Sequence, residues 1–273
     1  MKPLNVWQIP NQFLLSYNRV LQILSAHAEV SSKASNSFGD FDEDFAKNYI
    51  ETTSFQKFLL ALGSGYVVLR DPFKVHMSTC FSETTGLYAA GNLLKRVEST
   101  EEGRRLLMDK PRVNSKTIDL EKLKHLPDDT FGKAYFNFLF QNNLTPDSRH
   151  VVRFIKDINV AYVIQRYREI HDFVHTVLGM PPNTLGETTV KWVEAYQTKL
   201  PYCVMGVIFG PLSIPSKKRS IYFKYYAPWG FQTAKDCKFL YNIYFEKRWE
   251  QPLTELRDEL CIETLNLPQQ IKL

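Results

Sequence analysis

Cysteine is scarce in this chain, and the few cysteines stand far apart. Four occur in 273 residues, and no two of them form a CxxC pair: Cys80, Cys203, Cys237 and Cys261. Zinc ribbons and disulfide frameworks need paired or closely spaced cysteines, so the sequence excludes both classes. Isolated cysteines are typical of reduced thiols in an intracellular compartment.

Long hydrophobic runs are also missing. A membrane-spanning helix needs about 18 or more consecutive apolar residues, and no such stretch occurs. The nearest approach, residues 200–215, is uncharged but is interrupted by two prolines and two glycines before residue 212. We therefore predict no transmembrane helix, and we interpret this segment as buried core or as the wall of an apolar cavity that faces lipid.

No strong excess of charge of one sign is present. The formal net charge is +5, and the one local basic cluster is Lys217-Lys218-Arg219. This charge is too mild and too dispersed for a nucleic-acid-binding protein, although it is compatible with weak affinity for an anionic membrane. With 44% hydrophobic and 23% charged residues, the composition indicates one large globular domain rather than a disordered protein.

Strand patterns are nearly absent, and the apolar residues recur with helical periods instead. We predict helices over residues 55–69, 82–99, 101–109, 120–126, 130–142, 161–180, 185–199, 203–209, 217–227, 237–251 and 253–261. The predicted fold class is all-α, with a single helical domain over residues 53–267 and a carboxyl-terminal tail over residues 268–273. The many aromatic residues of the last third are interpreted as core packing.

The amino-terminal segment, residues 1–52, has a different character. Its first 28 residues contain no Asp or Glu, and residues 13–24 form an amphipathic piece. This is a weak mitochondrial presequence pattern, but only Lys2 and Arg19 are basic, so a divergent surface helix is the alternative. Residues 31–44 are rich in serine and then acidic, which predicts a linker.

The strongest functional signal is His171-Asp172-Phe-Val-His175, followed after 11 residues by Glu187. On a helix, His171, Asp172 and His175 share one face, with the two imidazoles a turn apart. Both imidazoles can then reach one divalent ion, while Asp172 either ligates it or orients His175. A mixed nitrogen and oxygen donor set suits zinc, manganese or ferrous iron, and the sequence does not choose among them.

Glu187 belongs to the next predicted helix. Gly179 and the paired prolines 181 and 182 end the first helix, and Asn183 or Thr184 can cap the second. The resulting helical hairpin would fold Glu187 back toward the histidines. Two plainer interpretations remain open: Glu187 forms a capping box with Thr184, and the histidines lie on a solvated polar face.

These residues resemble the ubiquinone biosynthesis protein 4 family, whose defining pattern is His-Asp-x-x-His, 11 residues, Glu. The similarity runs through residues 161–176 and covers about residues 53–267. Further matching segments are Glu83-Thr-Thr-Gly86, Thr130-Phe-Gly132, Asp147-Ser-Arg149, Gly186-Glu187, Pro228-Trp229 and Tyr244-Phe-Glu-Lys-Arg-Trp-Glu-Gln251. One departure is Val151, where the family pattern has proline.

The resemblance implies an all-helical protein with a metal-binding helical hairpin and an apolar groove for a lipid tail. It implies that His171, Asp172, His175 and Glu187 bind a divalent metal, with Zn2+ favoured and Fe2+ or Mn2+ as alternatives. The location implied is the matrix side of the mitochondrial inner membrane, as a peripheral protein. The implied partners are other ubiquinone biosynthesis enzymes in a multi-subunit complex, a polyprenylated benzoate substrate and the lipid surface, with no nucleic acid; a homodimer stays open.

The implied reaction removes the ring carbon 1 carboxylate from 4-hydroxy-3-methoxy-5-polyprenylbenzoate and gives 2-methoxy-6-polyprenylphenol, with coupled carbon 1 hydroxylation as a variant. Protonation at carbon 1 needs an acid, and the candidates are Glu194, which shares the helical face of Glu187, and metal-bound water. Arg168 is the candidate partner of the substrate carboxylate, although an ion pair with Asp172 is the plainer interpretation, as an ion pair also is for Lys191. Residues 203–209 and the carboxyl-terminal aromatics are candidates to line the groove.

Two other classes of protein remain as alternatives. In a non-catalytic scaffold, the ion would staple the hairpin, the groove would hold a lipid, and the surface would recruit other enzymes. A zinc hydrolase is the third hypothesis, because the motif looks like HExxH. The glutamate between the histidines, which is the general base of HExxH, is missing, and this argues against a hydrolase.

Overall fold

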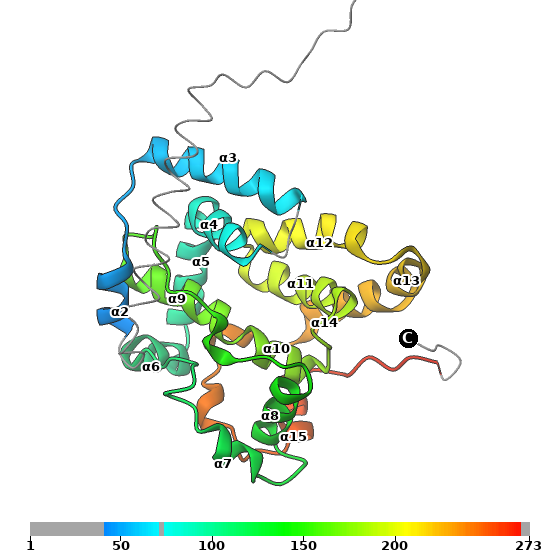
Figure 1. Cartoon of the computed structure of the whole chain (residues 1–273). Helices are drawn as coiled ribbons and strands as arrows, with labels where there is room; N and C mark the ends of the chain where they lie inside the picture. Colours follow the sequence, from blue (N-terminus) through cyan, green and yellow to red (C-terminus); the bar gives the residue numbers. More distant parts are fainter. Residues whose placement is uncertain (1–40, 71–73, 269–273) are drawn as a thin grey trace, which may run out of the picture.

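The computed structural model describes residues 41–70 and 74–268, and in these ranges the chain folds into helices (Figure 1). The α-helices are α2 (Phe41–Asn48), α3 (Ser54–Arg70), α4 (Val75–Thr85), α5 (Leu87–Glu98), α6 (Glu101–Asp109), α7 (Leu120–Lys124), α8 (Phe131–Gln141), α9 (Ile158–Glu169), α10 (His171–Leu178), α11 (Thr184–Thr198), α12 (Pro201–Ser213), α13 (Ser216–Ile221), α14 (Ala227–Asp236) and α15 (Leu253–Glu259). Short helical turns are η1 (Pro146–Ser148), η2 (Tyr222–Tyr226), η3 (Leu240–Asn242) and η4 (Phe245–Lys247). The described residues contain no strand, so the predicted all-α fold is confirmed.

Side-chain caps fix where several helices begin. The hydroxyl of Thr100 accepts from the backbone N–H of Gly103 at the start of α6, and Thr130 caps α8 in the same way. The carboxylate of Asp157 accepts from two backbone N–H groups at the start of α9. Such caps satisfy N–H groups that have no partner within the helix, so these short polar residues mark the helix starts.

Helices α9 and α10 form the centre of the molecule, and every residue from Ala161 to Leu178 is buried (Figure 1). The charged side chains of α9 are paired with distant segments, through Arg112–Glu169 at 2.8 Å, Arg168–Glu83 at 2.8 Å and Arg166–Glu246 at 2.9 Å. Burial of a charge is tolerated when it is paired and hydrogen-bonded. The interpretation of the two histidines as part of a solvated polar face is therefore wrong.

Two predicted helices are each divided in the structure. The segment 82–99 separates into α4 and α5 at Gly86, where an added Cβ would lie 2.5 Å from the carbonyl oxygen of Ser82. Glycine is needed there because no side chain fits so close to the backbone. The segment 161–180 separates into α9 and α10 at Ile170, whose backbone angles are φ −87° and ψ 2°.

The helix predicted over residues 237–251 is wrong. That segment forms only the turns η3 and η4, and its apolar residues Leu240, Tyr241 and Phe245 enter the core individually. The backbone there is held from outside, since the N–H of Leu240 donates to the Gln197 side chain at 3.0 Å. The separate helix α14 was not predicted. Residues 41–44, which were predicted as part of a linker, form the start of α2. The predictions for residues 1–40 lie outside the described residues.

The structure also bears on the predictions for the cysteines, for membrane-spanning helices and for the carboxyl-terminal aromatic residues. All four cysteines are unpaired, and no helix in the described ranges has the length and apolar character to cross a bilayer. Several carboxyl-terminal aromatics pack in the core, as predicted; Trp249, for example, stacks on Phe131 with ring centroids 5.4 Å apart. Phe223 and Phe231 differ, being 60% and 44% exposed.

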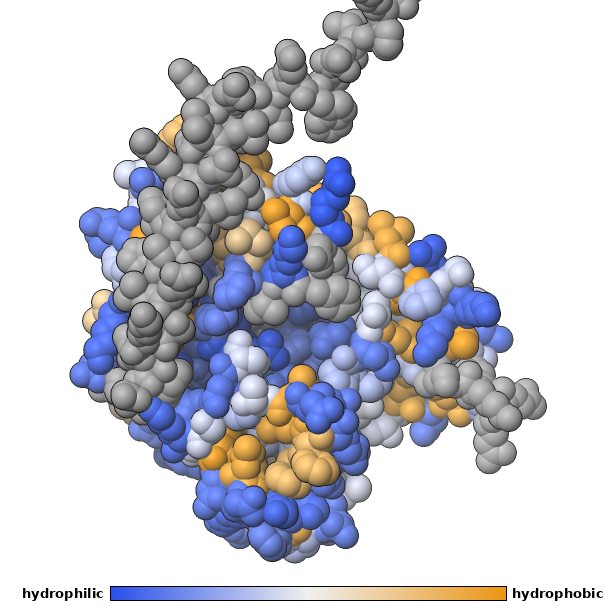
Figure 2. Space-filling view, in the orientation of Figure 1, coloured by the Kyte–Doolittle hydropathy of each residue, from blue (hydrophilic) through white to orange (hydrophobic). Residues whose placement is uncertain are grey.

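Apolar side chains are exposed on two helices that both pack against α4. On α3 they are Phe55, Phe58, Leu62, Tyr66 and Leu69, and on α12 they are Val204, Ile208, Phe209 and Leu212. Figure 2 shows apolar residues near α12 and a second group over α8, with a hydrophilic region between them. We call the exposed residues of α3 and α12 the apolar face.

Candidate metal centre

Helices α10 and α11 contact each other and are joined by a short turn rich in proline. Helix α10 ends at Gly179, whose φ of +67° is a left-handed conformation that glycine adopts without strain. In α11, a Cβ added at Gly186 would lie 2.0 Å from the carbonyl oxygen of Pro181. The turn can therefore pack this closely on the first turn of α11 only because residue 186 has no side chain.

Asn183 caps α11, and this leaves Glu187 free for another role. The side-chain oxygen of Asn183 accepts from the backbone N–H groups of Leu185 and Gly186 at 3.1 and 3.0 Å. The carboxylate of Glu187 instead lies against the two histidines of α10. The interpretation of Thr184 and Glu187 as a capping box is therefore wrong.

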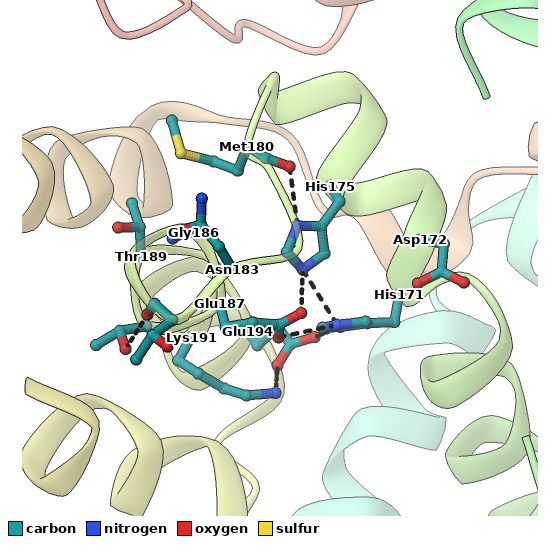
Figure 3. Close-up of polar contacts among 12 residues, drawn as sticks. His171, Asp172, His175, Met180, Asn183, Gly186, Glu187, Thr189, Lys191 and Glu194 are labelled. Carbon is teal, nitrogen blue, oxygen red and sulfur yellow. Dashed lines mark hydrogen bonds and ion pairs between the residues drawn. The ribbon is translucent and has the colours of Figure 1, made fainter. Parts of the chain in front are cut away.

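Three side chains converge at one point between α10 and α11 (Figure 3). The Nε2 atoms of His171 and His175 lie 3.1 Å apart. One oxygen of Glu187 lies 3.3 Å from His171 Nε2, and the other lies 3.4 Å from His175 Nε2. One ligand atom from each residue falls within 4.8 Å of the others, which is compatible with a shared metal ion.

Each imidazole is held through its other nitrogen. Nδ1 of His175 lies 3.0 Å from the carbonyl oxygen of Met180, and Nδ1 of His171 lies 2.7 Å from Oε1 of Glu194. An Nδ1–H that donates to oxygen leaves the Nε2 lone pair directed outward, which is the tautomer that binds metal. Both rings are thus oriented with Nε2 toward Glu187.

The electrostatics of this cluster favour a positive charge at its centre. Burial opposes the protonation of His171, but the carboxylates of Glu194 and Glu187 outweigh it and raise the pKa of His171 to about 9. Burial would raise the pKa of Glu187, yet the two histidines hold it well below its usual range. Two nitrogen donors and a carboxylate that attract a cation are the donor set of a divalent metal such as zinc, so the residues present fit such an ion.

The structure does not bring Asp172 into this cluster. Its Oδ1 accepts from Nη2 of Arg149 at 2.9 Å, and the side chain points away from the two Nε2 atoms (Figure 3). The alternative role of Asp172, orienting His175, falls to the carbonyl oxygen of Met180 instead. The physical reason is the angle of about 100° between consecutive residues of a helix, which turns residue 172 away from the face that residues 171 and 175 share.

Arg168 lies outside the cluster as well. Its guanidinium donates to Glu83 at 2.8 Å and to the carbonyl oxygen of Thr79 at 3.2 Å. An ion pair was the plainer interpretation for this residue, but the partner is Glu83 and not Asp172. Because the guanidinium of Arg168 already donates to Glu83 and Thr79, it is poorly suited to bind a substrate carboxylate.

Glu194 lies behind His171 and is fully buried. Besides His171 it accepts from the hydroxyl of Tyr167 at 3.0 Å and forms an ion pair with Lys191. Burial would raise the pKa of Glu194, but Lys191 and His171 hold it well below its usual range. The ion pair predicted for Lys191 is thus present, and Glu194 is placed to orient a histidine rather than to meet a substrate.

Two parts of the centre were missed by reasoning from the sequence. One is Arg149, which comes from a loop and carries no periodic signal. The other is the carbonyl oxygen of Met180, which no side-chain motif reveals. For Arg149, the only available signal was its place in the matching segment Asp147-Ser-Arg149.

Comparisons with known proteins agree on one family. The family model described as "Coenzyme Q (ubiquinone) biosynthesis protein Coq4" matches residues 47–266. A protein of Anopheles gambiae named "Ubiquinone biosynthesis protein COQ4 homolog, mitochondrial" is 48% identical over 226 residues, which cover 83% of this chain and 80% of the relative. A protein of the same name from Drosophila ananassae is 44% identical over 261 residues, covering 96% of this chain and 97% of the relative.

A solved structure is similar in fold. It is the crystal structure of a Nostoc punctiforme protein assigned to ubiquinone biosynthesis, and it matches with a TM-score of 0.59. The match covers 73% of this chain and 95% of that chain at 18% sequence identity. At this identity the similarity supports the helical fold alone.

Proposed function

The chain belongs to the coenzyme Q (ubiquinone) biosynthesis protein Coq4 family, and on that premise we propose that it is a metal-dependent carboxy-lyase of ubiquinone biosynthesis. Its relatives are named as mitochondrial proteins of this pathway, so membership of the family supports a role in ubiquinone biosynthesis and a mitochondrial location. The proposed substrate is 4-hydroxy-3-methoxy-5-polyprenylbenzoate. The proposed product is 2-methoxy-6-polyprenylphenol, with CO2 released from ring carbon 1.

The observation that carries this proposal is the convergence of His171, His175 and Glu187 on one point. A divalent ion bound there would supply a positive charge that polarises a carboxylate or phenolic oxygen of the substrate. The chain itself holds the imidazoles in place through Glu194 and the carbonyl oxygen of Met180. Preformed ligands of this kind reduce the reorganisation that binding and catalysis require.

The reaction needs a proton at ring carbon 1. When the bond from carbon 1 to the carboxylate breaks, its electron pair stays on the ring and is neutralised by this proton. Glu194 is a poor acid, because Lys191 and His171 favour its ionised form and no face of it is exposed. We therefore assign Glu194 as a positioning residue and propose that water supplies the proton beside Glu187, whose side chain is 35% exposed.

The oxidative variant would place a hydroxyl on carbon 1 with O2 as the oxidant. A redox-active ion such as Fe2+ would suit that reaction, whereas Zn2+ suits plain decarboxylation. The donor set of two imidazoles and one carboxylate accommodates either ion. Identification of the metal that copurifies with the active protein would separate the two reactions.

We further propose that the apolar face docks on the inner membrane from the matrix side. Between residues 54 and 70 and between residues 201 and 235, the sequence contains no Asp or Glu. The second range carries five basic residues, Lys217, Lys218, Arg219, Lys224 and Lys235. Exposed aromatic and aliphatic side chains beside basic residues suit a bilayer with anionic headgroups, and the polyprenyl tail could reach the site along α12.

A non-catalytic scaffold that organises the ubiquinone biosynthesis enzymes is the second candidate. The buried ion pairs of α9 favour it, because they give a rigid framework that needs no reaction to explain it. Organisation of the complex is compatible with catalysis, so the question is whether product forms. A hydrolase is disfavoured, because the position between the histidines that would carry the general base is occupied by Asp172, which is paired with Arg149.

The test measures metal content and product together. Full-length protein and its His175→Ala variant would be assayed for bound metals and for CO2 release from the polyprenylated substrate, with and without O2. We expect the variant to remain folded by circular dichroism and to lose both metal and product. A fully metal-loaded wild type that forms no product, even with the partner enzymes added, would refute the catalytic proposal and favour the scaffold.

A further inference from the structure

Arg149 stands on a loop whose backbone is fixed by buried side chains. It follows η1 in an extended conformation, with φ −98° and ψ 106°. Downstream, Gln165 accepts from the N–H of Val152 at 3.0 Å, and Glu83 accepts from the N–H groups of residues 153 and 154 at 2.8 Å each. The position of Arg149 is therefore set by the fold and does not depend on a ligand.

The guanidinium of Arg149 is only partly paired. Nη2 donates to Asp172, whereas Nε is buried and has no hydrogen-bond partner among the described residues. A buried N–H without an acceptor is unfavourable, and nearly all such groups in folded proteins are paired. The side chain as a whole is 27% exposed, so an acceptor that enters from solvent reaches Nε when the side chain shifts enough to uncover it.

Arg149 also interacts electrostatically with the carboxylates of the candidate metal centre. Burial works against its charge, but the carboxylates of Asp172 and Glu187 outweigh burial and raise the pKa of Arg149. The side chain is therefore a permanent cation within electrostatic reach of Glu187. Two other cations near the centre, Arg168 and Lys191, already donate to Glu83 and Glu194.

We propose that Arg149 binds the carboxylate of an aryl carboxylate substrate and positions it at the edge of the metal centre. This assignment rests on the proposed function, since it identifies the group that holds the part of the substrate to be removed. A carboxylate oxygen accepts from the free Nε–H, and the planar guanidinium fixes the direction of approach.

Asp172 limits how strongly this pair forms. It already neutralises part of the charge of Arg149, so the substrate carboxylate meets a weaker cation than a lone arginine would present. This matters because the carboxylate loses its charge when it leaves as CO2. A very strong pair would stabilise the bound substrate more than the transition state and slow the reaction.

The experiment compares binding of two probes to full-length protein loaded with one metal, with each titration completed before CO2 release becomes detectable. The probes are 4-hydroxy-3-methoxy-5-geranylbenzoate and its carboxamide, which differ only in the charged group, and dissociation constants come from calorimetry. We expect Arg149→Met to weaken binding of the acid by about ten- to a hundredfold, the range for a hydrogen bond between charged groups, and to leave the carboxamide unaffected. Lys156→Met, which removes an exposed positive charge from the same loop, should change neither affinity.

Several outcomes would overturn the assignment. In the first, Arg149→Met binds the acid as tightly as wild type does. In the second, Arg149→Met loses affinity for the acid and the carboxamide to the same extent. In the third, wild type binds neither probe. If Arg149→Met does not fold, Arg149→Lys serves in its place, because it retains the charge but lacks the Nε–H. Selective acid binding that depends on Arg149, in a protein that releases no CO2, would refute decarboxylation and leave the role of Arg149 intact.

Discussion

Nε2 of His171 and Nε2 of His175 lie 3.1 Å apart, and Nδ1 of each ring is hydrogen-bonded to an oxygen, that of Glu194 or of the Met180 carbonyl. Because Glu194 and Glu187 raise the pKa of His171 to about 9, its ring is protonated near neutral pH and Nε2 of His171 donates toward His175 and Glu187. A shared divalent cation would take the place of that proton, and Glu187 adds a negative charge on the same side. This relationship leads to predictions about which residues control metal content.

Glu187→Gln and Asp172→Asn should differ in metal content, although each variant removes one charge and keeps the shape of the side chain. Glu187 lies among the imidazoles, whereas Asp172 is paired with Arg149. We expect Glu187→Gln to lose most of its metal on dialysis and Asp172→Asn to retain it, as measured by elemental analysis. The reverse result would indicate that Asp172 binds the metal and that Glu187 does not.

Glu194→Gln should weaken metal binding without removing a ligand. The amide oxygen can still accept from His171 Nδ1–H, but it carries no negative charge to strengthen that bond or to neutralise Lys191. We expect about a 10- to 100-fold loss of metal affinity, typical for outer partners of ligating histidines, and a loss of about 3–5 kcal/mol in unfolding free energy from the broken buried pair. Competition with a chelator and urea denaturation measure the two effects.

A control separates this effect from a general loss of negative charge. Glu250→Gln removes an exposed carboxylate whose partner Lys122 is also exposed, and we expect no change in metal affinity. Metal affinity in Glu194→Gln equal to that of wild type would contradict the orienting role of Glu194.

His150 should make the fold sensitive to acid. Partial desolvation and the nearby charges of His76, Arg153 and Arg168 lower the pKa of His150 to about 4, below its ordinary value of 6.5, although His150 is exposed and solvent screens part of this effect. The unfolded chain therefore binds a proton between pH 6.5 and 4 that the folded chain does not, so stability is present above pH 6.5 and declines as the pH falls toward 4. We expect a shallower decline in His150→Gln, measured by urea denaturation across this range, with His125→Gln as the matched histidine control.

Phe58→Glu should weaken membrane binding if the apolar face docks on lipid. Phe58 is 57% exposed on α3, and a carboxylate there would be repelled by anionic headgroups. We expect several-fold less protein to float with cardiolipin-containing vesicles than for wild type. Phe140→Glu makes the same change at a residue of α8 that is 74% exposed, and it should bind vesicles like wild type; an equal loss in both variants would argue against docking through α3.

Within the candidate metal centre, the residues that the sequence located best are those whose relationship is local. His171 and His175 are one helical turn apart, and glycine and proline mark the turn before Glu187, so spacing predicted that a hairpin brings the three residues together. Spacing also left a capping box open for Glu187, and the choice of these residues as ligands came from the family resemblance. The same periodicity predicted α3, α6, α8 and α11 to within one or two residues at each end.

Relationships between distant segments could not be predicted in this way. The partner of Arg168 is Glu83, 85 residues away, and the partner of Asp172 is Arg149 on an irregular loop. Nothing in a helical period distinguishes these from the nearer pair of Arg168 and Asp172. The segment 237–251 failed for a related reason, since its backbone is held by Gln197 of α11 rather than by its own hydrogen bonds.

The ion pairs that join α9 to residues 83, 112 and 246 also bear on how the molecule opens. Any motion that exposes α9 must separate buried charges contributed by three remote segments at once, so local opening is suppressed there. The amide protons of α9 should exchange with solvent only when the whole domain unfolds. The two histidines lie on α10, which is also buried and is separated from α9 by the single residue Ile170, so their spacing should persist when less buried helices open locally.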